Sequence, residues 1–386
     1  MKRLLILAAL CVTGCSRQPE PVSDNLPDFL HATYSVESLL SEAELSNPGY
    51  DAFDFIYLMA TPAEWPEIDF DLPRDEIVAL ADAFDYTRAG GHMPLVPEMV
   101  RKAHDAGAKI LLCFGGQKEF LPFLEKPERL RNFEAYMVRL VADNDFDGLD
   151  IDWEITLDKE LHAGMMNRLR ASLDSLADER NRTYYLTTAL SIDHVYDRPL
   201  ADSLSRAVDW INVMSYDMCD GIWGSTPSHN TSMAKLREKL AHWAPFDKRQ
   251  LCLGLANYGF YYKGLKPGEK ADGPLSRYGS YITYREFLPR VETGGWTEEY
   301  DPEAEVSYYF SPDREEFVTI ENPVSMRRKI EWITANGFRG AFWWEFHHDY
   351  VAPTAEQPAG RHHLIHVVTA YLKEHAADAP KTEKDE

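Results

Sequence analysis

The chain has 386 residues, which is enough for two ordinary domains or for one large α/β barrel with insertions. Lysine and arginine total 40 and aspartate and glutamate total 63, so the formal net charge is −23 at pH 7. This acidic balance argues against nucleic acid as a partner, because binding a phosphate backbone requires concentrated positive charge. Neutral ligands fit better, since 9 tryptophans and 20 tyrosines offer flat faces for stacking on sugar rings or other planar surfaces.

The first fifteen residues have the layout of a bacterial export signal. Two basic residues precede an apolar run over residues 4–12, which is too short to cross a membrane as a helix. Residues 12–15 (VTGC) resemble the lipobox of bacterial lipoproteins, which predicts Cys15 as the lipidation site, with a plain signal peptide as the alternative. Residues 16–27 are rich in proline and polar side chains and predict a flexible tether. Ser16 after the cysteine favours a lipid anchor in the outer membrane of the cell envelope, and the side of that membrane stays open.

From residue 53 onward, short apolar runs alternate with longer amphipathic segments, which is typical of βα units around a parallel sheet. The predicted strands are residues 53–60, 109–116, 147–154, 184–193, 208–217, 250–257 and 338–345. The predicted helices are residues 96–106, 129–143, 157–180, 231–243 and 361–375. Residues 53–60 are the first clear strand, residues 61–91 do not allow a second to be placed, and residues 376–386 predict a disordered tail.

One interval is too long for a single βα unit. The residues between the strands at 250–257 and 338–345 are roughly twice as many as a typical unit of an ~250-residue eightfold barrel uses. The excess, residues 259–320, contains several strand-like runs and is interpreted as a small α+β insertion that deepens a groove. The expected fold is therefore a (β/α)8 TIM barrel over residues 28–375, with this insertion between strand 7 and helix 7.

Residues 147–154 (DGLDIDWE) carry the strongest chemical signal. Successive side chains of a strand point to opposite faces, so Asp150, Asp152 and Glu154 line one face and the apolar residues line the other. A half-exposed structural strand would show the same alternation. The large apolar residues and the position of the acids at the end of the strand favour a functional site, because α/β folds place their chemistry there.

Several segments, taken in chain order, resemble glycoside hydrolase family 18, the chitinase family. Residues 147–154 are similar to its D-G-x-D-x-D-x-E strand, and residues 214–217 (MSYD) to its M-x-Y-D strand end. Residues 340–344 (GAFWW) resemble its final strand, residues 228–230 (SHN) its T-G-H-N loop, and residues 253–259 (LGLANYG) its seventh strand. The insertion would then correspond to the insertion domain of one subfamily.

The resemblance implies substrate-assisted catalysis, in which the 2-acetamido group of the sugar attacks the anomeric carbon and no protein nucleophile is needed. It implies that Glu154 is the general acid and then the base, that Asp152 orients the acetamido group, and that Asp150 shares a proton with Asp152. Tyr216 would donate to the acetamido oxygen, and Asp217 would contact the same sugar. The implied partner is an oligo- or polysaccharide that contains N-acetylglucosamine, and no cofactor is implied.

Further residues are expected to bind the substrate. Tyr57 falls where the first-strand tyrosine of the family is expected, and Trp344 matches the tryptophan that forms the floor of the site. Trp343 must face the opposite way, because adjacent strand residues alternate. Tyr216 and Met214 have an alternative role as packing inside the barrel. The full set of expected substrate contacts is Tyr57, Gly115, Gly116, Met214, Tyr258 and Trp344.

Three departures from the family pattern concern the expected subsite contacts and the preferred substrate length. Cys113 replaces a serine, Phe260 stands where an arginine often follows, and Gln117 replaces a common tryptophan. Two rival functions use the same fold: an endo-β-N-acetylglucosaminidase that acts on the chitobiose core of N-glycans, and a non-catalytic chitin-binding lectin. Trp153 before Glu154 resembles the chitinase branch, and lectins of this family usually lack the final glutamate.

The sequence predicts no metal site and no disulfide framework. After cleavage the cysteines are odd in number and widely spaced, which supports neither a disulfide scaffold nor a zinc cluster: Cys113, Cys219 and Cys252. His347 and His348 are adjacent at a strand end, but their side chains diverge and no carboxylate spacing accompanies them.

Overall fold

The computed structural model describes residues 26–46, 48–61, 68–116, 119–154, 156–218, 221, 223–351 and 361–376. The predicted signal, Cys15 and nearly all of the tether lie outside the described residues, as do Gln117, Cys219 and residues 377–386. In the described part of the chain, no helix is both long enough and apolar enough to cross a membrane.

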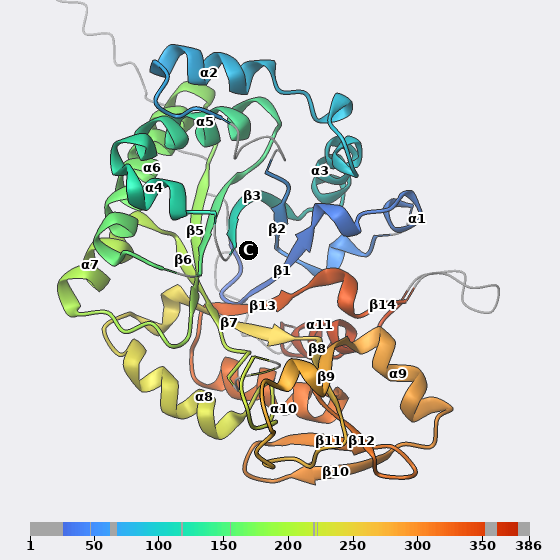
Figure 1. Ribbon diagram of the computed structural model, residues 1–386. Coiled ribbons are helices and arrows are strands. Elements are labelled where there is room, and N and C mark those ends of the chain that lie inside the picture. Colours follow the sequence, from blue (N-terminus) through green and yellow to red (C-terminus); the bar gives the residue numbers. More distant parts are fainter. Residues whose placement is uncertain are drawn as a thin grey trace, which may run out of the picture.

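Eight parallel strands close into a barrel in the order β1-β13-β7-β6-β5-β4-β3-β2, with helices outside the ring (Figure 1). This confirms the predicted (β/α)8 barrel. The barrel strands are β1 (Leu30–Val36), β2 (Phe55–Met59), β3 (Lys109–Gly116), β4 (Gly148–Trp153), β5 (Tyr185–Ser191), β6 (Trp210–Met214), β7 (Leu251–Ala256) and β13 (Gly340–Trp344).

The helices begin and end at local capping signals. The long helix α6 is capped at its start by Asp158, whose side chain accepts from the Leu161 N–H, and at its end by Asn181 in the left-handed conformation. The helices are α1 (Glu42–Leu45), α2 (Arg74–Ala83), α3 (Val96–Asp105), α4 (Leu121–Glu125), α5 (Leu130–Asp143), α6 (Lys159–Arg180), α7 (Arg198–Ala207), α8 (Met233–Lys239), α9 (Tyr284–Glu292), α10 (Pro323–Ala335) and α11 (Leu364–Ala376).

The order of the first strands corrects the sequence prediction. Residues 53–60 contain the second barrel strand, β2, because β1 precedes it and pairs with both β2 and β13. Residues 61–91, in which the sequence does not allow a second strand to be placed, contain α2. The apolar pattern of β1 is interrupted by His31, Thr33 and Ser35, which are all buried. Because three of the seven residues of β1 are buried polar side chains, a search for apolar runs does not detect this strand.

Two apolar layers share the barrel wall. Leu149, Ile151 and Trp153 of β4 belong to the large core between the strands and the surrounding helices. A smaller core includes Tyr34 of β1, Leu111 of β3 and Phe342 of β13 in the barrel interior, and it extends into the second sheet. The alternation of each strand therefore sorts its side chains between an outer layer and an interior layer, which is the usual construction of a filled barrel.

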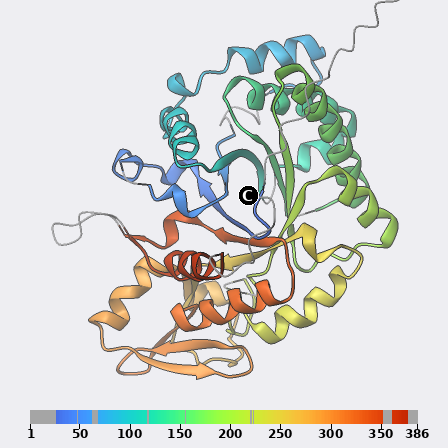
Figure 2. The ribbon, with the colours of Figure 1, turned by 180° about the vertical axis from the view of Figure 1, so that it is seen from behind.

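A second sheet follows β7 and lies beside the barrel (Figures 1 and 2). It is antiparallel in the order β10-β11-β12-β8-β9, and its helix α9 starts with a capping box between Thr283 and Glu286. Strands β8 and β9 lie on the barrel side and β10 on the far side (Figure 1). The strands are β8 (Tyr258–Lys263), β9 (Gly279–Thr283), β10 (Thr297–Asp301), β11 (Val306–Phe310) and β12 (Glu316–Ile320), and a separate pair is β14 (Tyr350–Val351) with β15 (Arg361–His362).

Candidate active site at the carboxyl ends of the barrel strands

The three carboxyl groups of the acidic strand lie at successive depths. Asp150 and Asp152 on β4 are buried, with 0% and 2% of their surface exposed, and Glu154 follows the last residue of the strand and is partly exposed. The two aspartates alternate with Leu149, Ile151 and Trp153, which belong to the outer core. The acidic side chains therefore rise from the barrel interior to the carboxyl-end rim, where barrel enzymes carry their active sites.

Asp150 is held by hydrogen bonds from four different strands. Its Oδ2 atom accepts from the Tyr34 hydroxyl at 2.8 Å and from the Cys113 thiol at 3.2 Å. Its Oδ1 atom accepts from the Thr187 hydroxyl at 2.5 Å and from the Asn212 amide at 3.4 Å. Burial raises the pKa of Asp150, and these donors act against that rise because they favour the charged form.

Asp152 is the least satisfied member of the series. Its Oδ1 atom is buried and has no hydrogen-bond partner among the described residues. Burial, together with the nearby charges of Glu154 and Asp150, raises the pKa of Asp152 well above its ordinary value. A buried polar atom without a partner costs free energy, so this oxygen is available to accept a hydrogen bond from a ligand.

Glu154 has a pKa that suits a proton donor near neutral pH. Burial, followed by the charges of Asp217 and Glu119, raises the pKa of Glu154 to about 7. A general acid works best when its pKa lies near the operating pH, because it is then both protonated and able to release its proton. A pKa near 7 suits the role of general acid and then base that the resemblance implies for Glu154, and this role stays a prediction.

Tyr216 and Asp217 follow the end of β6 and face the carboxyl groups. Tyr216 is 6% exposed, and burial raises the pKa of its hydroxyl, with Asp152 as the next cause, so the hydroxyl stays protonated and can donate. Asp217 adopts a left-handed backbone with φ of 52°. Its Oδ1 atom accepts from the Tyr258 hydroxyl at 2.8 Å.

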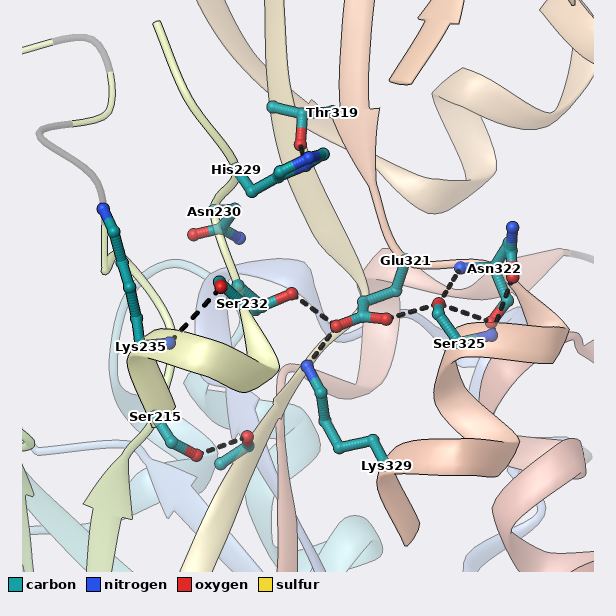
Figure 3. Close-up of polar contacts among 12 residues, drawn as sticks. Ser215, His229, Asn230, Ser232, Lys235, Thr319, Glu321, Asn322, Ser325 and Lys329 are labelled. Carbon is teal, nitrogen blue, oxygen red and sulfur yellow. Dashed lines mark hydrogen bonds and ion pairs between the residues drawn. The ribbon is translucent and has the colours of Figure 1, made fainter. Parts of the chain in front are cut away.

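Asn230 fixes the Asp217 backbone to the second sheet. Its Oδ1 atom accepts from the Asp217 N–H at 2.9 Å, and its Nδ2 group donates to the Tyr258 carbonyl at 3.2 Å. The flanking side chains anchor the same loop. His229 Nδ1 lies 2.7 Å from the Thr319 hydroxyl (Figure 3). The Thr231 hydroxyl donates to the Glu321 carboxylate. The loop over residues 228–232 therefore joins β12 and β8 to the edge of the active site.

The paired glycines at the end of β3 allow the chain to approach Asp152 closely. Gly115 is the register partner of Asp152, and its φ of 154° lies in the region that favours glycine. A Cβ atom at Gly115 would lie 1.9 Å from the Asp152 carbonyl oxygen, and one at Gly116 would lie 2.8 Å from the Glu119 carboxylate. Gly115 is therefore required by the backbone geometry beside the carboxyl groups.

The two tryptophans at the end of β13 face opposite sides of the barrel wall. Trp343 is fully buried in the outer core, and its Nε1–H donates to His31 Nε2 at 2.8 Å. Trp344 is partly exposed, packs against the interior core and lies 5.7 Å from the Tyr34 ring. Met214 is likewise partly exposed beside the interior core. Trp344 therefore presents a flat apolar face on the same side of the strand as the carboxyl groups.

Tyr57 requires a correction. It lies on the second barrel strand, is fully buried, and its hydroxyl contacts Asn212 at 3.3 Å and accepts from the Trp210 indole at 2.7 Å. A side chain with no exposed surface does not offer a contact to a sugar, so Tyr57 supports the layer beneath the carboxyl groups. The tyrosine on the first strand is Tyr34, which holds Asp150.

Several residues of the site were missed by the sequence reasoning: Tyr34, Thr187, Asn212 and Asn230. Two of them had a usable signal, because Asn212 shares a strand face with Met214, and Asn230 is the last residue of the SHN segment at residues 228–230. Thr187 and Tyr34 stand in short strands with no distinguishing pattern. In the parts of the chain that are described, no group of three His, Cys, Asp or Glu side chains could hold a metal ion.

Comparison with known proteins decides the family. The family model of glycosyl hydrolases family 18 matches residues 72–349. The chain belongs to this family. The sporulation-specific chitinase 2 of Saccharomyces cerevisiae is 26% identical over 285 residues, which are 62% of this chain and 54% of that relative. Chitinase A1 of Niallia circulans is 25% identical over 247 residues, which are 53% and 35% of the two chains. The chain spans about half the length of the first curated relatives it matches.

Solved structures show the same fold. A mutant of the family 18 chitinase of Cycas revoluta, in complex with (GlcNAc)4, has a TM-score of 0.70 at 17% identity and covers 89% of this chain and 99% of that chain. A family 18 N-acetylglucosaminidase of Paenibacillus barengoltzii has a TM-score of 0.63 at 19% identity, with 89% and 99% covered. At these identities the likeness concerns the fold, and the site must be argued from its own residues.

Proposed function

We propose that this family 18 member is a retaining glycoside hydrolase that cleaves β-1,4 linkages next to N-acetylglucosamine in chitin or chitooligosaccharides. The observation that carries the proposal is the pair formed by Asp152 and Glu154. Asp152 presents a buried oxygen without a described partner, and Glu154 beside it has a pKa raised to about 7. One group is suited to accept an N–H from the substrate, and the other is suited to donate a proton.

The first step uses Glu154 as the acid. Its proton passes to the glycosidic oxygen as the bond from that oxygen to the anomeric carbon breaks, and the acetamido carbonyl oxygen of the same sugar forms a new bond to the anomeric carbon. The product is a cyclic oxazolinium ion, whose N–H donates to Asp152. Tyr216 donates its hydroxyl to the acetamido group and orients it for attack.

The second step reverses the role of Glu154. The glutamate is now a carboxylate, accepts a proton from water, and the resulting hydroxide attacks the anomeric carbon as the oxazolinium ring opens. Two displacements at one carbon retain its configuration. Asp150 is held by the donors of four strands and shares the charge of Asp152, because neighbouring carboxyl groups do not all ionise together.

The test compares substrates and variants in one assay. Wild type, Glu154→Gln and the matched control Glu160→Gln, which changes an exposed glutamate at the start of α6, are incubated with chitohexaose and with a high-mannose glycoprotein. Mass spectrometry should find chitooligosaccharide products with wild type and with Glu160→Gln only. Cleavage of the glycoprotein alone would identify an endo-β-N-acetylglucosaminidase instead. Binding of chitohexaose without any cleavage by wild type would identify a lectin.

We further propose that the protein is lipid-anchored in a bacterial outer membrane through Cys15. The VTGC segment and the tether rich in proline support this proposal, and both lie almost wholly outside the described residues. Cys15→Ala should move the protein from the membrane fraction to the soluble fraction and abolish metabolic labelling with palmitate. If the Cys15→Ala variant stayed in the membrane fraction although it was not labelled, this result would contradict the lipid anchor.

A further inference from the structure

Tyr281 occupies an unusual position for a large aromatic residue. It lies on β9, the edge strand of the second sheet, opposite Phe260 of β8. Phe260 is fully buried, whereas 37% of the Tyr281 surface is exposed. Strands β8 and β9 form the barrel side of this sheet (Figure 1). Tyr281 is therefore an exposed aromatic side chain on the strand pair nearest the barrel.

The Tyr281 ring is part of the wall next to Asp217. It stacks on the Tyr258 ring with centroids 4.5 Å apart and an interplanar angle of 20°. The hydroxyl of Tyr258 in turn donates to Asp217 at 2.8 Å. Through this stack, Tyr281 lies one aromatic ring away from a carboxylate of the catalytic face.

A buried polar chain from the end of β13 holds the Tyr281 hydroxyl. This hydroxyl lies 2.9 Å from Nδ1 of His348, and Nε2 of His348 lies 3.3 Å from Glu345. His347 contacts Glu345 at 2.8 Å and Glu44 at 2.6 Å. Burial opposes the charge of His347, but the hydrogen bonds to these two carboxylates outweigh it and raise the pKa of His347 to about 9. Glu345 directly follows Trp344, so the segment that holds the Tyr281 hydroxyl continues from the strand end that carries Trp344.

We propose that Tyr281 is a specificity-determining residue that stacks on an N-acetylhexosamine ring bound beside Asp217, with His348 as its positioning residue. Aromatic faces bind sugar rings through their apolar surface, and a ring whose hydroxyl is already hydrogen-bonded loses little side-chain entropy on binding. Asp217 supplies the polar group that fixes the orientation of the same sugar. The proposal rests on the proposed function for the class of its ligand.

The experiment separates binding from catalysis. Binding of N,N′,N″-triacetylchitotriose is measured by calorimetry in the Glu154→Gln background, and kcat and KM are measured with the same trisaccharide in the wild-type background. Tyr281→Ala should weaken binding by about three- to tenfold, the usual worth of one aromatic contact. It should raise KM with kcat nearly unchanged, because stacking stabilises the bound substrate and the transition state alike. Tyr281→Phe keeps the ring but removes the hydroxyl that contacts His348, so Tyr281→Phe and His348→Gln should each lose only about two- to threefold.

Tyr300→Ala is the matched control. Tyr300 is another exposed tyrosine of the same sheet, on its far strand β10, and its loss should leave KM unchanged. If Tyr281→Ala has a lowered melting temperature, Tyr281→Leu replaces it in the binding and kinetic measurements. Wild-type affinity in Tyr281→Ala, or a fall in kcat without a change in binding, would overturn the proposal. If wild type binds the sugar through Tyr281 without cleaving any substrate, the proposed reaction fails and the Tyr281 site stands.

Discussion

The two ends of β4 carry the same kind of side chain in opposite surroundings. At the entrance, Asp147 contacts Arg182 and His104, each at 2.8 Å, and accepts from the Ile110 N–H at 2.9 Å. At the exit, Asp152 and Glu154 form no ion pair with lysine or arginine among the described residues. Cations surround the first carboxylate, and other carboxyl groups surround the last two.

The pKa values follow the surroundings. Burial alone would raise the pKa of Asp147, but hydrogen bonds to His104 and Ile110 outweigh it and lower this pKa. Burial and neighbouring negative charges raise the pKa of Asp152 and of Glu154. One strand of a barrel thus serves stability at its amino end and proton transfer at its carboxyl end, which is the general division of labour in this fold.

The largest effect should come from the carboxyl end. Glu154→Gln keeps the size of the side chain and removes its proton transfer, so kcat should fall by about a thousandfold or more. Steady-state kinetics with chitohexaose check this value, and Glu160→Gln should behave as wild type. A fall of less than tenfold would remove Glu154 from the role of general acid.

Asp152→Asn should have the next largest effect. Its amide keeps the shape but replaces one acceptor oxygen by a donor, so the acetamido group loses an orienting partner and kcat should fall by about a hundredfold. KM should change much less, since the interaction strengthens in the transition state. A variant that raises only KM, with its pH profile of kcat unchanged, would place Asp152 outside the mechanism.

Asp147→Ala tests the amino end and should affect stability instead of activity. It leaves Arg182 and His104 without their shared carboxylate, and unfolding free energy should fall by about 3 kcal/mol. Urea unfolding measures the loss, and kcat per folded molecule should stay within twofold of wild type. The exposed Asp178 supplies a matched control, Asp178→Ala, that should leave both quantities unchanged.

The same residue predicts the sign of a pH effect. Because the folded state lowers the pKa of Asp147 from 3.8, the unfolded chain binds more protons in acid, and the stabilisation is present above this value and lost as the pH falls below it. Asp147→Asn should therefore flatten the acid loss of melting temperature. An identical pH dependence in the variant would contradict the ion pairs.

The pH profile of kcat/KM tests the contrast between the two ends of β4 at the carboxyl end. Glu154 must be protonated to act as the acid, so kcat/KM should fall above a pH of about 7, approaching tenfold per unit. The charge of Asp217 contributes to the raised pKa of Glu154, and Asp217→Asn should move this limb to lower pH. A limb that stays in place would show that burial alone sets the pKa.

The smallest effect concerns Cys113. Its thiol is a weak donor to Asp150 at 3.2 Å, and a serine hydroxyl would donate more strongly to the ionised form. Cys113→Ser should lower the pKa of Asp150 and change kcat by less than about threefold, with a small shift of the acid limb of the profile. A loss of more than tenfold would show that the thiol has a steric role.

Local pattern was sufficient for much of the barrel and for part of the site. Residues 109–116 and 250–257 are apolar runs between helices, and β3 and β7 lie within them. β1 escaped prediction because the partners that satisfy its polar side chains are remote in sequence. His31 contacts the Ala52 carbonyl at 2.7 Å and the Trp343 indole, 312 residues away. No local pattern records such a pairing.

For the strands that carry Asp150 and Trp344, the sequence already determined which side chains share a face. Alternation alone places Asp150, Asp152 and Glu154 on one face, and it separates Trp344 from Trp343, because a strand has a period of two whatever surrounds it. The tertiary structure decided which groups meet that face. Tyr34, and not Tyr57, reaches Asp150 across 116 residues of chain, because β1 closes the barrel between β2 and β13. The pKa of Glu154 was decided in the same way, since burial and opposing carboxylates exist only once the barrel has closed.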